Sequence, residues 1–135
     1  MNFGSAFAVL PQRCQTSGVL KVYAYSGCDT CRRALKFLRE HDVAHEVIPI
    51  REQPPTKAEL QRLLKVYGGD VRKLFNTSGQ DYRALGLGAK LDALSATDAL
   101  ALLAANGNLV KRPFVVMKDG GVVGFKEADW IKLLL

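Results

Sequence analysis

The order of apolar and polar positions predicts a strand–helix–strand unit near the start of the chain. Residues 19–25, VLKVYAY, are mostly apolar and rich in β-branched and aromatic side chains, as in a buried strand. Residues 45–50, HEVIPI, predict a second strand. Since the links are short, the two strands should be parallel. The helix between them starts near residue 28 and has an apolar stripe at helical spacing, made of Cys31, Ala34, Leu35 and Leu38.

The middle of the chain predicts a block of helices. In PPTKAELQRLLKVYGG, Thr56 and Glu59 form a capping box, and Gly68-Gly69 ends the helix. LSATDALALLAANG predicts another helix that begins at Ser95. The glycine-broken segment between the two predicts short helices and turns.

The end of the chain predicts a hairpin and a last helix. The hairpin joins FVVM (114–117) and VVGF (122–125) through the turn KDGG, and KEADWIKLLL follows as a helix. The whole order is βαβ, a helical block, then ββα. It predicts an α/β, thioredoxin-like fold with a helical subdomain inserted at about residues 53–110.

Length and charge narrow the classes of function. The chain has 135 residues, about one domain, and we expect residues 19–135 to form it. No apolar run is long enough to cross a membrane. The net charge of +6 favours anionic partners, whether nucleic acid, acidic protein or a small oxyanion. No base-reading motif accompanies the basic face of the first helix, so we interpret that face as solvated and expect no direct binding of nucleic acid.

The first 18 residues differ from the rest. Their apolar part, Ala6–Leu10, is short and no Lys or Arg precedes it, so we expect a loose, flexible tail rather than a secretory signal. Cys14 lies in this tail and receives no role. An odd number of cysteines, three, indicates a reducing compartment, and we expect a cytoplasmic monomer.

Cys28 and Cys31 could bind a metal, pack in the core or react. Structural zinc needs four N or S ligands, and His41 should lie at the far end of the same helix, so no metal is expected. Packing suits Cys31, which lies on the apolar stripe. Cys28, at the junction of strand and helix, should face unpaired N–H groups and the positive end of the helix dipole. These acidify a thiol, and Arg32 acts in the same direction, so a reactive Cys28 is the preferred interpretation.

A proline stands directly before the predicted hairpin, in KRPFVV. An ordinary trans turn proline is the common case. In a thioredoxin-like layout, however, this loop faces the start of the first helix. A cis Arg112–Pro113 bond would then turn the Arg112 side chain toward Cys28.

Three segments together resemble the ArsC/Spx family: YSGCDTCRRALKFL, LFNTSGQDYRALGL and LVKRPFVV. The resemblance runs from about Val19 to the C-terminus. In the family's glutaredoxin-dependent arsenate reductases, the cysteine after the first strand attacks arsenate and arginines hold the oxyanion. By match, the resemblance implies Cys28 as nucleophile, Arg32 and Arg112 as oxyanion ligands, and Pro113 as the cis proline.

The chain departs from the arsenate reductases at three positions. Asn76 stands where they carry a further arginine, and Phe125-Lys126 stands where they carry another. Lys126 keeps a charge but not a bidentate fork. Cys31 completes a CxxC motif, which is typical of the Spx-like regulators. Those proteins bind the RNA polymerase α subunit and use the motif as a thiol–disulfide switch.

The resemblance leads to two hypotheses. The first is a thiol-dependent reductase in which Cys28 attacks an oxyanion or mixed disulfide and Cys31 resolves the adduct. It would hold no bound cofactor and would take electrons from glutathione–glutaredoxin or thioredoxin. The alternative is a Spx-like redox regulator of transcription. In the first hypothesis, the residues that contact the substrate beside Cys28 are Arg112, Arg32, Asn76, Pro113 and Lys126.

Overall fold

A computed structural model describes residues 19–118 and 120–135. The predicted tail, with Cys14, lies outside the described residues. No helix in the described ranges combines the length and apolar character that a membrane crossing requires. The elements, in chain order, are β1 (Leu20–Ala24), α2 (Asp29–Glu40), β2 (His45–Pro49), α3 (Lys57–Val66), η1 (Val71–Leu74), α4 (Gln80–Ala84), α5 (Leu87–Lys90), η2 (Leu91–Ala93), α6 (Ala96–Ala105), η3 (Gly107–Leu109), β3 (Phe114–Met117), β4 (Gly120–Val123) and α7 (Glu127–Leu134).

The four described strands form one mixed sheet in the order β2-β1-β3-β4. β1 and β2 are parallel, with Leu20 opposite His45, and α2 connects them. β3 runs antiparallel to both β1 and β4. The predicted thioredoxin-like order, βαβ then ββα, is therefore confirmed, and the helices from α3 to η3 stand between its two halves.

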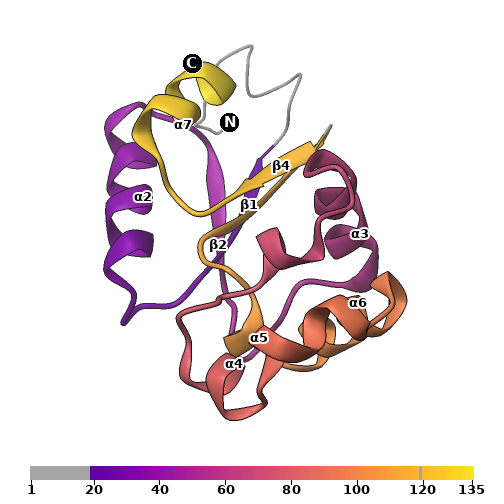
Figure 1. The fold of residues 1–135 in the computed structure, drawn as a ribbon. Helices are drawn as coiled ribbons and strands as arrows, with labels where there is room; N and C mark the ends of the chain where they lie inside the picture. The colour runs from indigo at the N-terminus through magenta and orange to yellow at the C-terminus, as the bar shows by residue number, and fades with distance from the viewer. Residues whose placement is uncertain (1–18, 119) are drawn as a thin grey trace.

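Helices cover both faces of the sheet (Figure 1). α2 and α7 lie on one face, and α3 and α6 lie on the other. Side chains of β1 alternate between the two layers, as the period of a strand requires. Leu20 and Val22 pack with α2 and α7 around the fully buried Trp130, whereas Tyr23 packs in the core beside α3 and α6.

The final hairpin differs from its prediction. β4 begins at Gly120 rather than Val122 and ends at Val123, so the glycines of the predicted turn belong to the strand. The reason is close packing: a Cβ on Gly121 would lie 2.2 Å from the Val115 carbonyl oxygen and 2.8 Å from Leu63 of α3. Only glycine allows this approach. Phe125 follows the strand instead and packs edge-on against Trp130, with ring centroids 4.9 Å apart.

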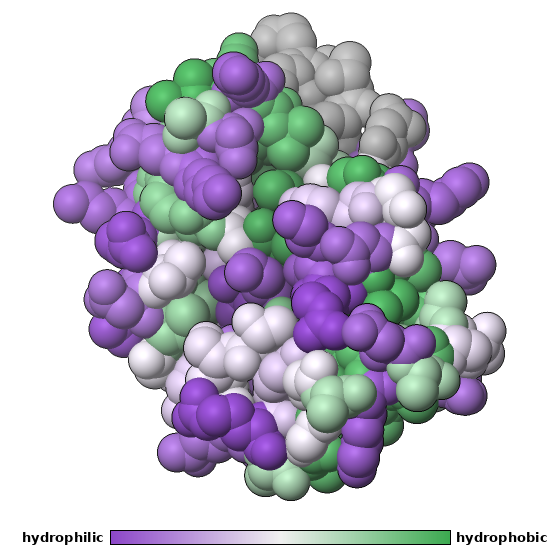
Figure 2. Space-filling model, in the orientation of Figure 1, coloured by the Kyte–Doolittle hydropathy of each residue, from purple (hydrophilic) through white to green (hydrophobic). Residues whose placement is uncertain are grey.

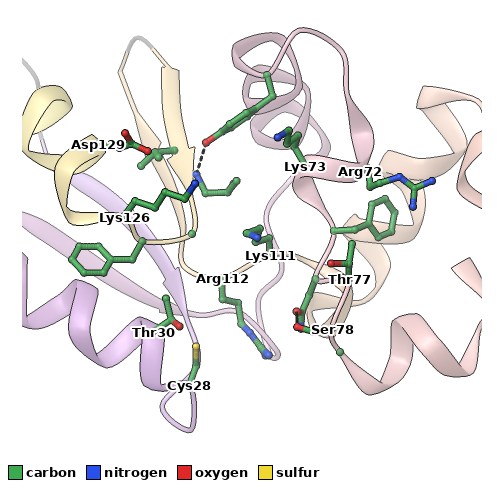
Figure 3. Close-up of a pocket in the computed structure, with 18 of the residues that line it drawn as sticks. Cys28, Thr30, Arg72, Lys73, Thr77, Ser78, Lys111, Arg112, Lys126 and Asp129 are labelled. Carbon is green, nitrogen blue, oxygen red and sulfur yellow. Dashed lines mark hydrogen bonds between the residues drawn. The ribbon is translucent and has the colours of Figure 1, made fainter. Parts of the chain in front are cut away.

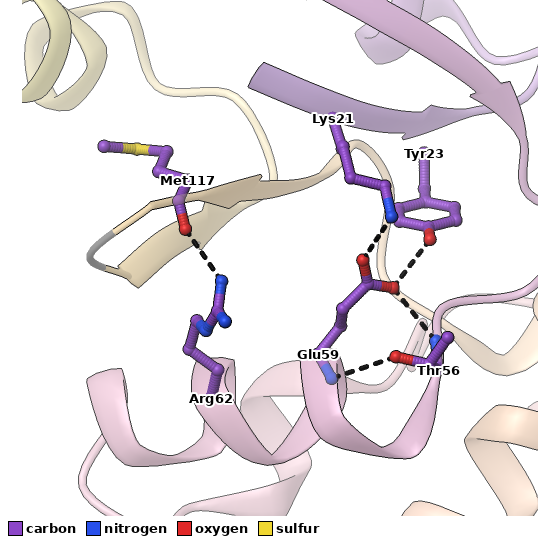
Figure 4. Close-up of polar contacts among 6 residues, drawn as sticks. All are labelled: Lys21, Tyr23, Thr56, Glu59, Arg62 and Met117. Atoms are coloured by element: carbon purple, nitrogen blue, oxygen red, sulfur yellow. Dashed lines mark hydrogen bonds and ion pairs between the residues drawn. The ribbon is translucent and has the colours of Figure 1, made fainter. Parts of the chain in front are cut away.

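A polar cluster joins α3 to β1 (Figure 4). Glu59 accepts hydrogen bonds from Lys21 Nζ and from the Tyr23 hydroxyl, both at 2.6 Å. Thr56 completes the predicted capping box, since its backbone N–H also donates to Glu59. Burial raises the pKa of Glu59, but the hydrogen bonds from Lys21 and Tyr23 outweigh burial and hold that pKa below its usual value. The Glu59 carboxylate is thus stabilised in its charged form.

Glu59→Gln is expected to lower the free energy of unfolding by about 1–3 kcal/mol at pH 7, since it removes charge-assisted hydrogen bonds. The folded pKa of Glu59 lies below its unfolded value near 4.5. The stabilisation is therefore present above that value and is lost as pH falls through the folded pKa. Urea unfolding of both proteins between pH 7 and pH 3 should show the difference shrinking with acid. Glu46→Gln, at an exposed carboxylate of β2, is the control, and a pH-independent difference at Glu59 would contradict this account.

Candidate functional site at the start of helix α2

Cys28 caps the N-terminus of α2. Its backbone is extended (φ −96°, ψ 118°), and its Sγ accepts a hydrogen bond from the Cys31 N–H at 3.3 Å. The Cys28 N–H donates to the Tyr25 carbonyl oxygen at 3.0 Å, which holds the short loop after β1 closed. Cys28 is half-buried, and its sulfur lies at the N-terminus of a twelve-residue helix, the positive end of the helix dipole.

Cys31 has a different environment. It lies inside α2 on the apolar stripe and is only 1% exposed. Burial is the main cause that raises the pKa of Cys31 to about 12; the neighbouring Cys28 acts in the same direction, whereas a hydrogen bond with the Tyr25 backbone and the charge of Arg112 act in the opposite direction. Cys31 is thus the more buried thiol of the two, as the sequence predicted.

A cleft of about 960 Å³ opens beside Cys28 (Figure 3). Cys28 and Thr30 lie on one side of it, and Thr77 and Ser78 of the helical block lie on the other. The basic residues that line it outnumber the acidic Asp70 and Asp129; they are Arg72, Lys73, Lys111, Arg112 and Lys126. Hydrophilic side chains also dominate the centre of the face drawn in Figure 2. The cleft is suited to an anion.

Arg112 lies in the middle of this cleft. The Arg112–Pro113 peptide is cis, as predicted. The side chain extends into the space between Cys28 and Ser78 (Figure 3). Its guanidinium lies over the ring of Tyr25, 5.3 Å from the ring centroid. Arg112 and Cys28 therefore line one space although 84 positions separate them in the chain (112 − 28).

The other predicted ligands divide into two groups. Asn76 and Lys126 line the cleft. The Asn76 backbone is anchored to Leu109, whose carbonyl oxygen accepts from the Asn76 N–H at 2.7 Å. Arg32 is not among the cleft-lining residues. Its guanidinium instead donates to the Ser26 carbonyl oxygen and pairs with Asp29 at 3.2 Å, and its side chain is 58% exposed.

Sequence reasoning missed three residues of the site. Lys73 and Lys111 line the cleft and form no ion pair within the described residues. The position of Lys111 next to Arg112 in KRPF was a usable signal, because both residues precede the same strand. The sequence around Lys73 contained no such signal, because Lys73 lies in a short 3-10 helix that has no periodic pattern of apolar residues. Tyr25 was assigned only to a strand, although its ring lies under Arg112.

The described residues contain no group of three or more His, Cys, Asp or Glu side chains placed to share a metal ion. His41 caps the opposite end of α2 from Cys28. The cleft places the Cys28 thiol beside basic side chains.

The chain is similar to several known proteins. YusI of Bacillus subtilis, an uncharacterized protein, is 47% identical over 80% of this chain and 92% of its own length. The solved structure of a possible arsenate reductase from Streptococcus mutans is 40% identical and superposes with a TM-score of 0.77 over 84% of this chain and 98% of its own. The global transcriptional regulator Spx of Streptococcus agalactiae is 27% identical over 82% of this chain and 80% of its own length. The model of the ArsC family matches residues 23–133, most of the chain, and the similar solved structure shares its fold: the chain belongs to the ArsC family.

Proposed function

We propose that the protein is a thiol-dependent oxidoreductase of the arsenate-reductase type. The observation that carries the proposal is the position of Cys28, whose sulfur caps α2 at the edge of a cleft lined by Arg112 and Lys126. A helix end and fixed cations favour both the thiolate and an anionic substrate. The relation to a possible arsenate reductase supports the same class of reaction.

The proposed reaction consumes two thiols. Cys28 attacks the central atom of a bound oxyanion, and one oxygen leaves as water. Cys31 then gives up its proton and attacks the Cys28 sulfur, which forms a disulfide and releases the oxyanion reduced by two electrons. With a mixed disulfide as substrate, the same attack releases the second thiol. Glutathione with glutaredoxin, or thioredoxin, would supply two electrons to restore both thiols.

Arg112 is the proposed anchor of the oxyanion, with Lys126 as a second charge and Asn76 as a neutral donor. Pro113 shapes the loop that presents Arg112. Arg32, held by Ser26 and Asp29, acts on the thiol only through its charge unless it leaves those partners. The cleft therefore presents fewer bidentate guanidinium groups to an oxyanion than it would with arginine in place of Asn76 and Lys126.

Asn76→Arg is expected to lower KM for arsenate about ten- to a hundredfold with little change in kcat, since one charged hydrogen bond contributes about 1.5–3 kcal/mol. The anchored backbone of Asn76 keeps the new side chain beside the cleft. Turnover is measured with glutaredoxin or thioredoxin as donor. Gln61→Arg, which adds the same charge at an exposed position of α3 outside the cleft, is the control and should leave KM unchanged. Absence of arsenate turnover in every variant would exclude arsenate as substrate.

A second candidate is a redox regulator that resembles Spx. Two observations favour it: the CxxC spacing, with the Cys31 N–H donating to Cys28 Sγ at 3.3 Å, and the 27% identity to Spx. We expect such a protein to bind the RNA polymerase α subunit differently in its reduced and disulfide states. Pull-down with that subunit, before and after mild oxidation, measures this directly. Equal and negligible capture in both states would leave only the reductase proposal.

A further inference from the structure

The ring of Tyr25 lies where several parts of the site meet. Tyr25 follows β1 directly, and its carbonyl oxygen accepts from the Cys28 N–H at 3.0 Å. A Cβ on Gly27 would lie 2.7 Å from the Tyr25 ring, so the loop that carries Cys28 rests against this ring. The same residue therefore contacts the loop of the reactive thiol through both its backbone and its side chain.

Two guanidinium groups lie over the same ring. The Arg112 guanidinium carbon is 5.3 Å from the Tyr25 ring centroid, and that of Arg51 is 4.5 Å from it. Both distances are within the range of cation–π attraction. Two like charges near one ring repel each other. The attraction of each guanidinium to the electron-rich ring offsets this repulsion.

Arg51 is held in place by a hydrogen bond to a residue outside the cleft. Its Nε donates to the Asn108 side-chain oxygen at 2.7 Å, and the Asn108 amide donates to Asp81 at 3.3 Å. Asn106 also donates to Asp81, at 3.0 Å. This chain of contacts leads from α4 and η3 to the Tyr25 ring, yet Arg51, Asn108 and Asp81 are not among the cleft-lining residues.

We propose that Tyr25 is a positioning residue for Arg112: its ring, clamped by Arg51, holds the guanidinium in the cleft beside Cys28. The inference rests on the proposed function only in taking Cys28 as the reacting thiol. Without the ring, Arg112 keeps its charge but samples other directions, and the positive potential at the Cys28 sulfur falls. A purely structural role for Tyr25 would alter stability and leave that potential unchanged.

The test compares alkylation of Cys28 by iodoacetate, an anion, and by iodoacetamide, which is neutral. The ratio of the two rates reports the local positive potential and needs no reductase activity, so it remains valid if the proposed function fails. Cys14→Ser is used as the background, and peptide mapping follows Cys28 alone. Arg112→Gln removes the Arg112 charge, so the ratio of the iodoacetate rate to the iodoacetamide rate in this variant gives the low reference value.

Tyr25→Leu is expected to lower the ratio about two- to fivefold toward that of Arg112→Gln, which corresponds to the strength of an exposed cation–π contact. Tyr25→Phe keeps an aromatic face and should retain the wild-type ratio. Adding Tyr25→Leu to Arg112→Gln should cause no further fall. A wild-type ratio in a folded Tyr25→Leu protein would overturn the proposal. Should Tyr25→Leu not fold, Arg51→Lys decides: it keeps the charge but not the planar group, and an unchanged ratio would again overturn the proposal.

Discussion

Alkylation of Cys31 by iodoacetamide at pH 7 is expected to be roughly a thousandfold slower than that of an ordinary exposed thiol, and Cys28 should carry almost all of the label. The pKa of Cys31 is raised to about 12 by burial. At pH 7 such a thiol is ionised in about one molecule in 10⁵, against a few per cent for a thiol with the usual pKa near 8.5. The thiolate is the nucleophile, so the rate follows this fraction.

The measurement follows labelling of the Cys14→Ser protein by peptide mapping. Labelling of Cys31 should rise about tenfold for each unit of pH between 7 and 10, since the ionised fraction rises in that proportion. Cys28→Ser should remove nearly all fast labelling at neutral pH, and Cys31→Ser should leave it. Labelling of Cys31 as fast as that of Cys28 would reverse the roles assigned to the two thiols. It would also remove the basis for treating Cys28 as the nucleophile.

Gly107→Ala is expected to destabilise the fold by about 3 kcal/mol or more, which lowers Tm by about 10 °C. A Cβ at this position would lie 1.8 Å from the Ile50 carbonyl oxygen and 2.7 Å from its carbon. Both obstacles belong to the backbone, so no side chain can move aside. The segment from Asn106 to Asn108, which reaches Asp81 and Arg51, would have to shift away from the end of β2.

Gly88→Ala is the matched control. It lies in α5, where a Cβ would meet Tyr82 at an ordinary 3.8 Å. The higher helix propensity of alanine should leave stability unchanged or raise it by up to about 1 kcal/mol. Thermal unfolding followed by circular dichroism measures both variants. A Gly107→Ala protein that melts with the wild type would show that the two segments do not approach as closely as described.

The local sequence determined most of the elements and was sufficient to single out Cys28 as the proposed nucleophile. Helical spacing, the Thr56–Glu59 capping box and the β-branched strands act over a few neighbouring residues, and the predicted helices and parallel strands follow them closely. The contrast between Cys28 and Cys31 is equally local. One residue precedes the helix and the other lies on its apolar stripe, so a sequence pattern is sufficient to separate them.

Tertiary structure decided which charges surround that nucleophile. Lys73 and Arg112 meet Cys28 at one cleft because separate elements converge there. The KRPF motif indicated Arg112, but nothing in the residues around Lys73 records that convergence. Arg32 shows the opposite effect: it lies four positions after Cys28, yet its helical direction takes it to Asp29 and Ser26. The sequence likewise did not indicate why glycine stands in β4 and at position 107. Another backbone segment approaches closely at these positions, which only the packed structure reveals.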